Sequence, residues 1–182
     1  ELDLGRLPDE VREKVFAAFG PEPEHQLYDR GIRRRLAPMF GGDRRLIELA
    51  NSLLLTLPAT PVIWMGDEIG MGDDLSLPER YCARTPMQWS DEPNGGFTLA
   101  RKPVRPVISG GPYGFEHLNV AEQMRDPDSL LNWFERMIRM RKEIPEIGWG
   151  RFEVVDVGDP VVPAARYDGR NNMAPVLPTL AA

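Results

Sequence analysis

Residues 43–71 read DRRLIELANSLLLTLPATPVIWMGDEIGM, and this stretch decides the expected fold. Asp43 is a favoured helix N-cap, and apolar side chains recur at helical spacing from there to Leu57. Pro58 ends the predicted helix, and the apolar run at 61–65 is typical of a strand buried on both faces. A helix, a short link and a buried strand form the repeating step of a parallel α/β fold. The apolar positions of the helix are Leu46, Leu49, Ala50, Leu53, Leu54 and Leu57.

Two more helices are expected, one on each side of this step. The first spans residues 7–19, with acidic side chains in its first turn and Gly20 at its end. The second opens at Asp126 and Pro127, a cap followed by a first-turn proline. Each helix carries one apolar face, made of Val11, Val15, Phe16 and Phe19 in the first and of Leu130, Leu131, Phe134, Met137, Ile138 and Arg141 in the second.

Long irregular stretches separate the predicted helices. Residues 66–125 show almost no periodic pattern and are interrupted by glycine and proline throughout. Compact domains rarely keep so long a loop unless it has a function. Residues 21–42 are also expected to form a loop, with one helical turn, and the three arginines at 33–35 are interpreted as a solvated or salt-bridge surface in preference to a ligand site.

The composition changes at residue 148. Residues 151–155 and 161–162 are rich in valine and have the composition of strands, so a second, β-rich unit is expected to begin here. Residues 173–182 are short, proline-interrupted and featureless, and we therefore expect this unit to be truncated. The predicted division is residues 1–147 and residues 148–182.

The overall composition indicates which kinds of partner the protein can bind. With 182 residues, 42% hydrophobic and 27% charged, the chain is typical of a soluble globular protein. A net charge of -6 gives no basic footprint for nucleic acid or an anionic membrane, so a small neutral substrate fits better. The single cysteine, Cys82, and the lack of a membrane-spanning or signal-peptide pattern favour a cytoplasmic protein.

Two neighbouring carboxylates follow the predicted strand. Ligands of parallel α/β folds bind at the carboxyl ends of strands, which is where Asp67 and Glu68 are expected. Side chains adjacent in sequence rarely converge on one bond, so structural hydrogen bonding is the preferred interpretation for both. His25 and His117 have no partner at metal-ligand spacing, and nucleotide-binding glycine motifs are incomplete. No metal and no cofactor are expected.

The segment 84–91, RTPMQWSD, groups side chains suited to sugars. The Arg84 guanidinium donates in a fixed fork, Gln88 both donates and accepts, and the Trp89 ring can stack on a pyranose. The alternative, that Trp89 and Met87 only pack the loop onto the fold, stays open from the residues alone, and so does a packing role for Arg84.

These motifs resemble those of one family. Residues 57–71 resemble the eighth-strand segment of the α-amylase superfamily, glycoside hydrolase family 13. RTPMQW at 84–89 with NGGF at 94–97 is similar to its oligo-glucosidase and trehalose synthase branch, and GMGDDLS at 70–76 points to the trehalose synthase type. ELDLGRL at 1–7 resembles the segment directly after the family's Asn-His-Asp triplet, so the resemblance covers residues 1–172.

The resemblance implies a fold and a reaction. Residues 1–147 would be the end of a (β/α)8 barrel, incomplete in this chain, and residues 148–182 the start of a β-sandwich domain. Members of this branch interconvert maltose and trehalose by a retaining mechanism with a catalytic Asp, Glu and second Asp. No residue of this chain matches those three motifs, so the expectation is a carboxy-terminal fragment with no catalytic residue, inactive alone.

The resemblance also implies binding residues. Arg84 resembles an arginine that lines the family's substrate pocket, and Glu1 would lie beside the missing second Asp at the pocket floor. The partners implied are a small disaccharide and a complementing amino-terminal barrel fragment, with no nucleic acid and no membrane. The alternatives are a fragment of an α-glucosidase or oligo-1,6-glucosidase, or a non-catalytic remnant or complementing subunit.

Overall fold

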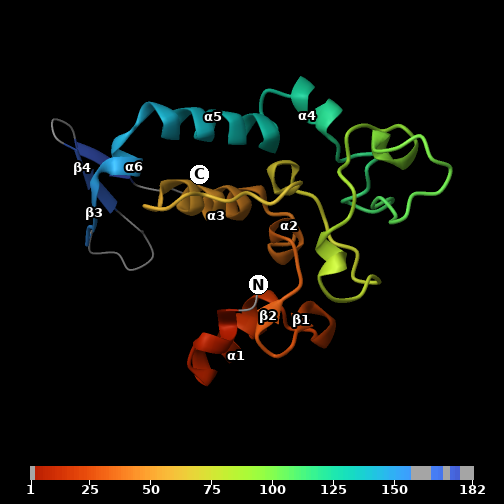
Figure 1. Cartoon of the computed structure of the whole chain (residues 1–182), viewed down its shortest axis with the longest axis horizontal. Coiled ribbons are helices and arrows are strands. Elements are labelled where there is room, and N and C mark those ends of the chain that lie inside the picture. The colour runs from red at the N-terminus through yellow and green to blue at the C-terminus, as the bar shows by residue number, and fades with distance from the viewer. Residues whose placement is uncertain (1–2, 157–164, 170–172, 177–182) are drawn as a thin grey trace.

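The computed structural model describes residues 3–156, 165–169 and 173–176, so the predictions for Glu1 and for the strand at 161–162 lie outside the described residues. In Figure 1 two long helices, α3 and α5, lie alongside each other, with α1 and the β1–β2 hairpin beyond one side and the long irregular segment beyond one end. The helices are α1 (Asp9–Phe19), α2 (Leu36–Met39), α3 (Arg44–Thr56), α4 (Val120–Arg125), α5 (Leu130–Glu143) and α6 (Glu146–Trp149). The 3-10 helices are η1 (Asp3–Arg6), η2 (Pro23–His25), η3 (Asp67–Ile69), η4 (Glu79–Ala83) and η5 (Pro93–Gly96), and the strands are β1 (Gln26–Leu27), β2 (Gly31–Ile32), β3 (Arg151–Val154), β4 (Ala165–Asp168) and β5 (Met173–Val176).

Helix α3 confirms its predicted cap but not its predicted buried face. The Asp43 carboxylate accepts a 2.9 Å hydrogen bond from the backbone N–H of Arg45. The residues that α3 buries are Ile47, Asn51, Leu55 and Thr56, which differ from the predicted leucines. The predicted face was wrong because α3 is apolar on two sides and only one of them packs on α5.

The main core lies between α2, α3 and α5. It consists of the buried side chains Ala37, Ile47, Leu55, Leu130 and Phe134, with Met137 and Ile138 packed against it. The apolar face predicted for α5 is therefore confirmed. Burying large side chains such as Phe134, which is 1% exposed, is the main stabilising contribution available to this helix pair.

Helix α5 begins later than predicted. Its N-cap is Ser129, whose hydroxyl accepts from the backbone N–H of Asn132 at 3.2 Å. Asp126 is instead the C-cap of α4, and its carboxylate accepts from the N–H of Asp128 at 2.9 Å. The prediction of a cap at Asp126 was wrong because that side chain stabilises the turn between two helices and does not open the second one.

The strand predicted at residues 61–65 is not formed. Residues 61–64 have no regular secondary structure, and Val62 is 76% exposed, so the prediction of a strand buried on both faces was wrong. A parallel strand exists only through hydrogen bonds to neighbouring strands. Among the described residues both sheets, β1–β2 and β3–β4–β5, are antiparallel, and neither includes this segment.

The short sheets differ from expectation in detail. The helical turn expected within residues 21–42 is confirmed as α2, but the β1–β2 hairpin was not expected, and Tyr28 and Asp29 turn it with positive φ. The predicted strand at 151–155 is confirmed as β3. Residues 173–176 form β5 and are not featureless as predicted. The buried Tyr167 of β4 donates its hydroxyl hydrogen bond to the Thr56 carbonyl, which ties this sheet to the end of α3.

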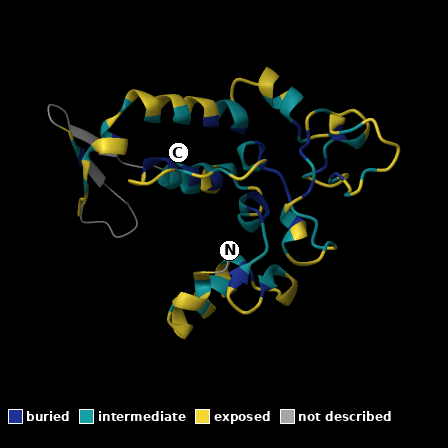
Figure 2. Ribbon diagram, viewed as in Figure 1, coloured by how far each residue is buried: buried dark blue, intermediate teal, exposed yellow. Residues whose placement is uncertain are grey.

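Figure 2 shows the segment after α3, residues 57–65, as largely exposed. Leu57, Val62, Trp64 and Met65 in this segment are between 43% and 76% exposed. Several large apolar side chains that are exposed close together favour association between molecules. None of the helices in the described part of the chain is long and apolar enough to cross a membrane.

We predict that the chain on its own associates through this segment. The double variant Leu57→Gln/Val62→Gln should shift the chain towards the monomer in size-exclusion chromatography, because it removes apolar area from the contact. The matched control is Leu99→Gln/Met124→Gln, which alters two exposed apolar positions that are separated from each other along the chain and should change little. A wild-type chain that runs as a monomer and unfolds cooperatively would contradict the prediction.

Candidate sugar-binding site

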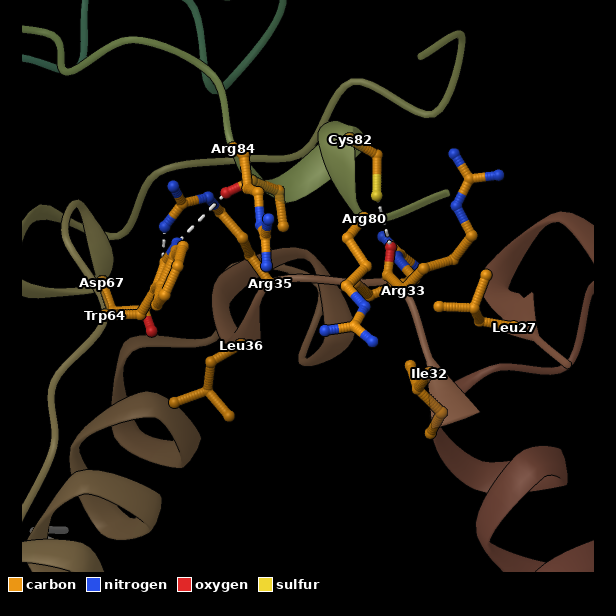
Figure 3. Close-up of a pocket in the computed structure, with 12 residues that line it drawn as sticks. Leu27, Ile32, Arg33, Arg35, Leu36, Trp64, Asp67, Arg80, Cys82 and Arg84 are labelled. Atoms are coloured by element: carbon orange, nitrogen blue, oxygen red, sulfur yellow. Dashed lines mark hydrogen bonds and ion pairs between the residues drawn. The ribbon is translucent and has the colours of Figure 1, made fainter. Parts of the chain in front are cut away.

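A small pocket lies where the β1–β2 hairpin, the segment ending at Asp67 and η4 meet (Figure 3). Its volume is about 100 Å³, well below the roughly 300 Å³ at which pockets for small organic ligands begin. Arginine is its most frequent lining residue. The polar and aromatic lining residues are Arg33, Arg34, Arg35, Arg80 and Arg84, with Trp64, Asp67 and Cys82.

Arg35 links two segments that are distant in sequence. Its Nη1 donates to the Asp67 carboxylate at 3.0 Å and to the Met65 carbonyl at 2.9 Å. The Arg35 side chain is 1% exposed and that of Asp67 is 23% exposed, so the ion pair is largely shielded from water. The Nε and Nη2 atoms of Arg35 are buried without a hydrogen-bond partner among the described residues.

Burial and pairing act on Asp67 in opposite directions. Desolvation raises the pKa of Asp67 above its ordinary value, and the nearby Arg35 charge and hydrogen bond lower the pKa in part. Burial is the larger of the two effects. Arg35 therefore offsets part of the effect of burial on the Asp67 pKa.

A second carboxylate completes the link. Asp73 Oδ2 accepts from the backbone N–H of Arg35 at 3.1 Å and pairs with Arg34 Nε at 3.3 Å. Arg33 donates to the carbonyls of Leu75 and Leu77. The arginine run was predicted as a solvated or salt-bridge surface, and the salt-bridge interpretation is confirmed for Arg34 and Arg35, whose partners lie at the start of the long loop.

Glu68 stabilises the turn at Gly66. Its Oε2 accepts from the backbone N–H of Gly66 at 2.7 Å. Gly66 has a φ of 95°, and a Cβ at this position would collide with Met71, so glycine is required here. Asp67 and Glu68 are both bonded within the protein and do not lie free in an open cleft. This arrangement is the one expected for structural residues.

Arg84 reaches the surface from a fixed backbone. Its N–H donates to the Tyr81 carbonyl at 3.0 Å, and the next residue, Thr85, is buried. The guanidinium carbon lies 5.7 Å from the centre of the Trp64 ring, and the Trp64 indole N–H donates to the Ala83 carbonyl at 3.2 Å. The side chain is exposed and lies at the edge of the small pocket (Figure 3).

A larger pocket shares Arg84. Its volume is about 610 Å³, within the range of roughly 300–1,000 Å³ found for small-molecule sites. Met65, Phe97 and Val104 supply apolar surface, and Lys102 and Arg105 add cationic donors near Arg84. A disaccharide needs this combination of apolar or aromatic surface and hydrogen-bond donors.

The other residues of the RTPMQW motif support the loop. Gln88 is 0% exposed, and its amide donates to the carbonyls of Tyr113 and Leu118, so it is unable to reach a sugar. Met87 is buried in a small core with Ile69 and Met71. Trp89 is 50% exposed, and its ring is accessible. Met87 and Gln88 therefore pack the loop, whereas Trp89 and Arg84 are exposed.

Sequence reasoning missed Arg35, Asp73 and Trp64 as parts of the site. The signal available was charge complementarity, because Arg34 and Arg35 pair with acids within residues 67–74. Glu1 lies outside the described residues. No cluster of three or more His, Cys, Asp or Glu side chains that could hold a metal occurs in the described part of the chain.

Removing Arg35 should lower the stability of the fold, because Asp67 loses its ion-pair partner. Arg35→Gln leaves a buried carboxylate unpaired, so we expect a loss of about 3 kcal/mol in the free energy of unfolding at neutral pH. The pKa of Asp67 should rise further, and since the folded state then binds its proton more tightly than the unfolded state, the loss should shrink as the pH falls through that pKa.

Urea unfolding at several pH values, on whichever form of the chain is monomeric, measures this effect. The control Lys14→Gln breaks an exposed pair with Glu10 and should change little. A loss for Arg35→Gln that is small, or that does not vary with pH, would contradict the assigned role of the pair.

The chain is similar in sequence to proteins of known family. The model of the alpha amylase catalytic domain matches residues 33–150. The trehalose synthase of Pimelobacter sp. is 42% identical over 164 residues, which cover 89% of this chain and 28% of that protein. The alpha-glucosidase of Pediococcus pentosaceus is more distant, 26% identical over 183 residues, covering 79% of this chain and 32% of that protein.

The likeness extends to solved structures. The crystal structure of alpha-amylase from H. orenii matches with a TM-score of 0.64 and 30% identity, covering 79% of this chain and 27% of that one. The chain thus spans less than a third of the length of the relatives it matches. On the matched catalytic-domain residues and this structural likeness, the chain belongs to the α-amylase family, glycoside hydrolase family 13.

Proposed function

We propose that this chain forms part of a trehalose synthase, which interconverts maltose and trehalose by retaining, intramolecular glucosyl transfer. The observation that carries the proposal is Arg84, an exposed guanidinium on a fixed backbone at the edge of a pocket of about 610 Å³. The 42% identity to a trehalose synthase over most of the chain supports this reaction over others in the family.

In this proposal the chain supplies binding and not the reacting carboxylates. A retaining mechanism needs two carboxyl groups about 5 Å apart across the glycosidic bond. Asp67 is paired with Arg35, and Glu68 accepts from the Gly66 N–H, so neither is available for that chemistry. The catalytic Asp, Glu and Asp that the resemblance implies have no match in this sequence, and the chain alone is therefore proposed to be inactive.

Arg84 would hold the sugar during the transfer. Its donors can bind hydroxyl oxygens of the disaccharide in a fixed direction, and the apolar surface of Phe97 and Val104 would cover a sugar face. Intramolecular transfer requires the released glucose to stay in place and turn before it attacks again, with water kept out. A directed cationic group beside an apolar wall suits that requirement.

The proposed fold context explains the exposed segment at 57–65. As part of a (β/α)8 barrel, residues 61–65 would pair with neighbouring strands and bury the apolar side chains that are exposed here. Residues 1–147 are assigned to the barrel and residues 148–182 to the start of a β-sandwich, consistent with the antiparallel β3–β4–β5. An amino-terminal barrel piece is the proposed partner, a small neutral disaccharide the substrate, and the cytoplasm the location.

A second candidate is an α-glucosidase of the same family. RTPMQW at 84–89 resembles both branches, and an alpha-glucosidase is among the more distant relatives. The two functions differ in the acceptor of the glucosyl group. The glucosidase transfers this group to water, whereas the synthase transfers it back to the glucose that is still bound. A non-catalytic remnant is the remaining alternative, and it agrees with the lack of matching catalytic carboxylates.

Two chimeras separate the first two candidates. In each, the residues of this chain replace the matched segment of a relative, either the Pimelobacter trehalose synthase or the Pediococcus alpha-glucosidase. We expect the first to convert maltose to trehalose and the second to fold poorly or lose activity, because this chain is 42% identical to the first partner and 26% identical to the second. Glucose release by the second chimera without trehalose formation by the first would favour the glucosidase.

Arg84→Ala in the trehalose synthase chimera tests the binding residue. Losing a charge-assisted hydrogen bond to the sugar should raise the KM for maltose by about 10- to 100-fold, corresponding to roughly 1.5–3 kcal/mol. The matched control is Arg105→Ala, a cation at the same pocket that lies over the Tyr81 ring, for which a smaller effect is expected. Unchanged KM for Arg84→Ala would contradict the proposed role.

A further inference from the structure

We infer that Trp64 is a positioning residue that sets the direction of the Arg84 guanidinium, and through it the affinity for the disaccharide. This inference rests on the substrate-binding role proposed for Arg84. Figure 3 places the Trp64 ring and the Arg84 side chain together in the small pocket. Trp64 makes two contacts here, one with the backbone carbonyl of Ala83, directly before Arg84, and one with the Arg84 guanidinium.

The first contact fixes the backbone before Arg84. The Trp64 indole N–H donates to the Ala83 carbonyl at 3.2 Å, and the Arg84 N–H donates to the Tyr81 carbonyl. Thr85 is buried directly afterwards. With the chain held on both sides, the only freedom left at this position is the direction of the long arginine side chain.

The second contact limits that freedom. The Arg84 guanidinium carbon lies 5.7 Å from the centre of the Trp64 ring, within the distance at which a cation is attracted to an aromatic face. Among the described residues no hydrogen bond or ion pair from the Arg84 guanidinium to a carboxylate competes with this stacking. An exposed arginine otherwise samples many rotamers, and each extra rotamer weakens binding.

The backbone at Trp64 and Met65 is bonded to the two residues of the ion pair, Asp67 and Arg35. The Asp67 N–H donates to the Trp64 carbonyl at 2.9 Å, and Arg35 donates to the Met65 carbonyl next to it. A line of contacts thus runs from Arg35 through Trp64 to Arg84. Phenylalanine at 64 would keep the ring face and lose the N–H donor, and leucine would lose both.

The test uses the trehalose synthase chimera with Trp64→Leu, Trp64→Phe, Arg84→Ala and the Trp64→Leu/Arg84→Ala double variant. We expect Trp64→Leu to raise the KM for maltose by about fivefold to tenfold with a smaller change in kcat, and Trp64→Phe to restore most of the affinity. In the double variant the KM should equal that of Arg84→Ala, because Trp64 acts only through Arg84.

A second readout does not depend on activity. The Arg84 Nε–H proton should show a ring-current shift in the NMR spectrum that Trp64→Phe reduces and Trp64→Leu abolishes. The inference is overturned if Trp64→Leu leaves this proton or the KM unchanged, or if its effect adds in full to that of Arg84→Ala. It is also overturned if Trp64→Leu fails to fold and Trp64→Phe shows neither change.

The two proposals fail in different ways. An unchanged KM for Arg84→Ala refutes the binding role of Arg84 and with it the effect of Trp64 on affinity. A raised KM for Arg84→Ala with full additivity refutes only the positioning role of Trp64. Equal losses of kcat in Trp64→Leu and Trp64→Phe, without a change in KM, would assign Trp64 a structural role instead.

Discussion

The buried ion pair between Arg35 and Asp67 is the interaction on which the site depends. It joins the residues after the β1–β2 hairpin to the turn at Gly66, and Asp73 adds a second link through the Arg35 backbone. The same arginine donates to the Met65 carbonyl, next to the tryptophan whose ring lies within cation–π distance of Arg84. Because the pair is shielded from water, breaking it leaves an unpaired buried charge, which is far more costly than losing a surface pair.

Local signals in the sequence predicted local structure. Asp43 capped α3 as expected, since an N-cap depends only on its own first turn, and the apolar face of α5 was also found. The strand at 61–65 was not, because a parallel strand requires hydrogen-bonding neighbours that a local pattern is unable to supply. The α5 cap moved to Ser129 because two capping residues stand close together and the turn after α4 uses the first.

The site was predicted only in part. The motif identified Arg84, and its exposure beside a pocket of about 610 Å³ agrees with a binding role, whereas Gln88 in the same motif is buried and bonded to backbone carbonyls. No sequence pattern distinguishes these two polar residues, because the difference arises from how the loop folds on α4 and α5. The pairing of Arg34 with Asp73 and of Arg35 with Asp67 is likewise a product of tertiary structure.

The most direct test of the account is maltose-to-trehalose conversion by this chain, alone and mixed with an amino-terminal barrel piece that ends in Asn-His-Asp. The account predicts conversion only in the mixture, because in the proposed function this chain would contribute Arg84 and the other piece would contribute the reacting carboxylates. Conversion by the chain alone would contradict it. No conversion by the mixture, with the partner piece shown to be folded, would also contradict it and favour a non-catalytic remnant.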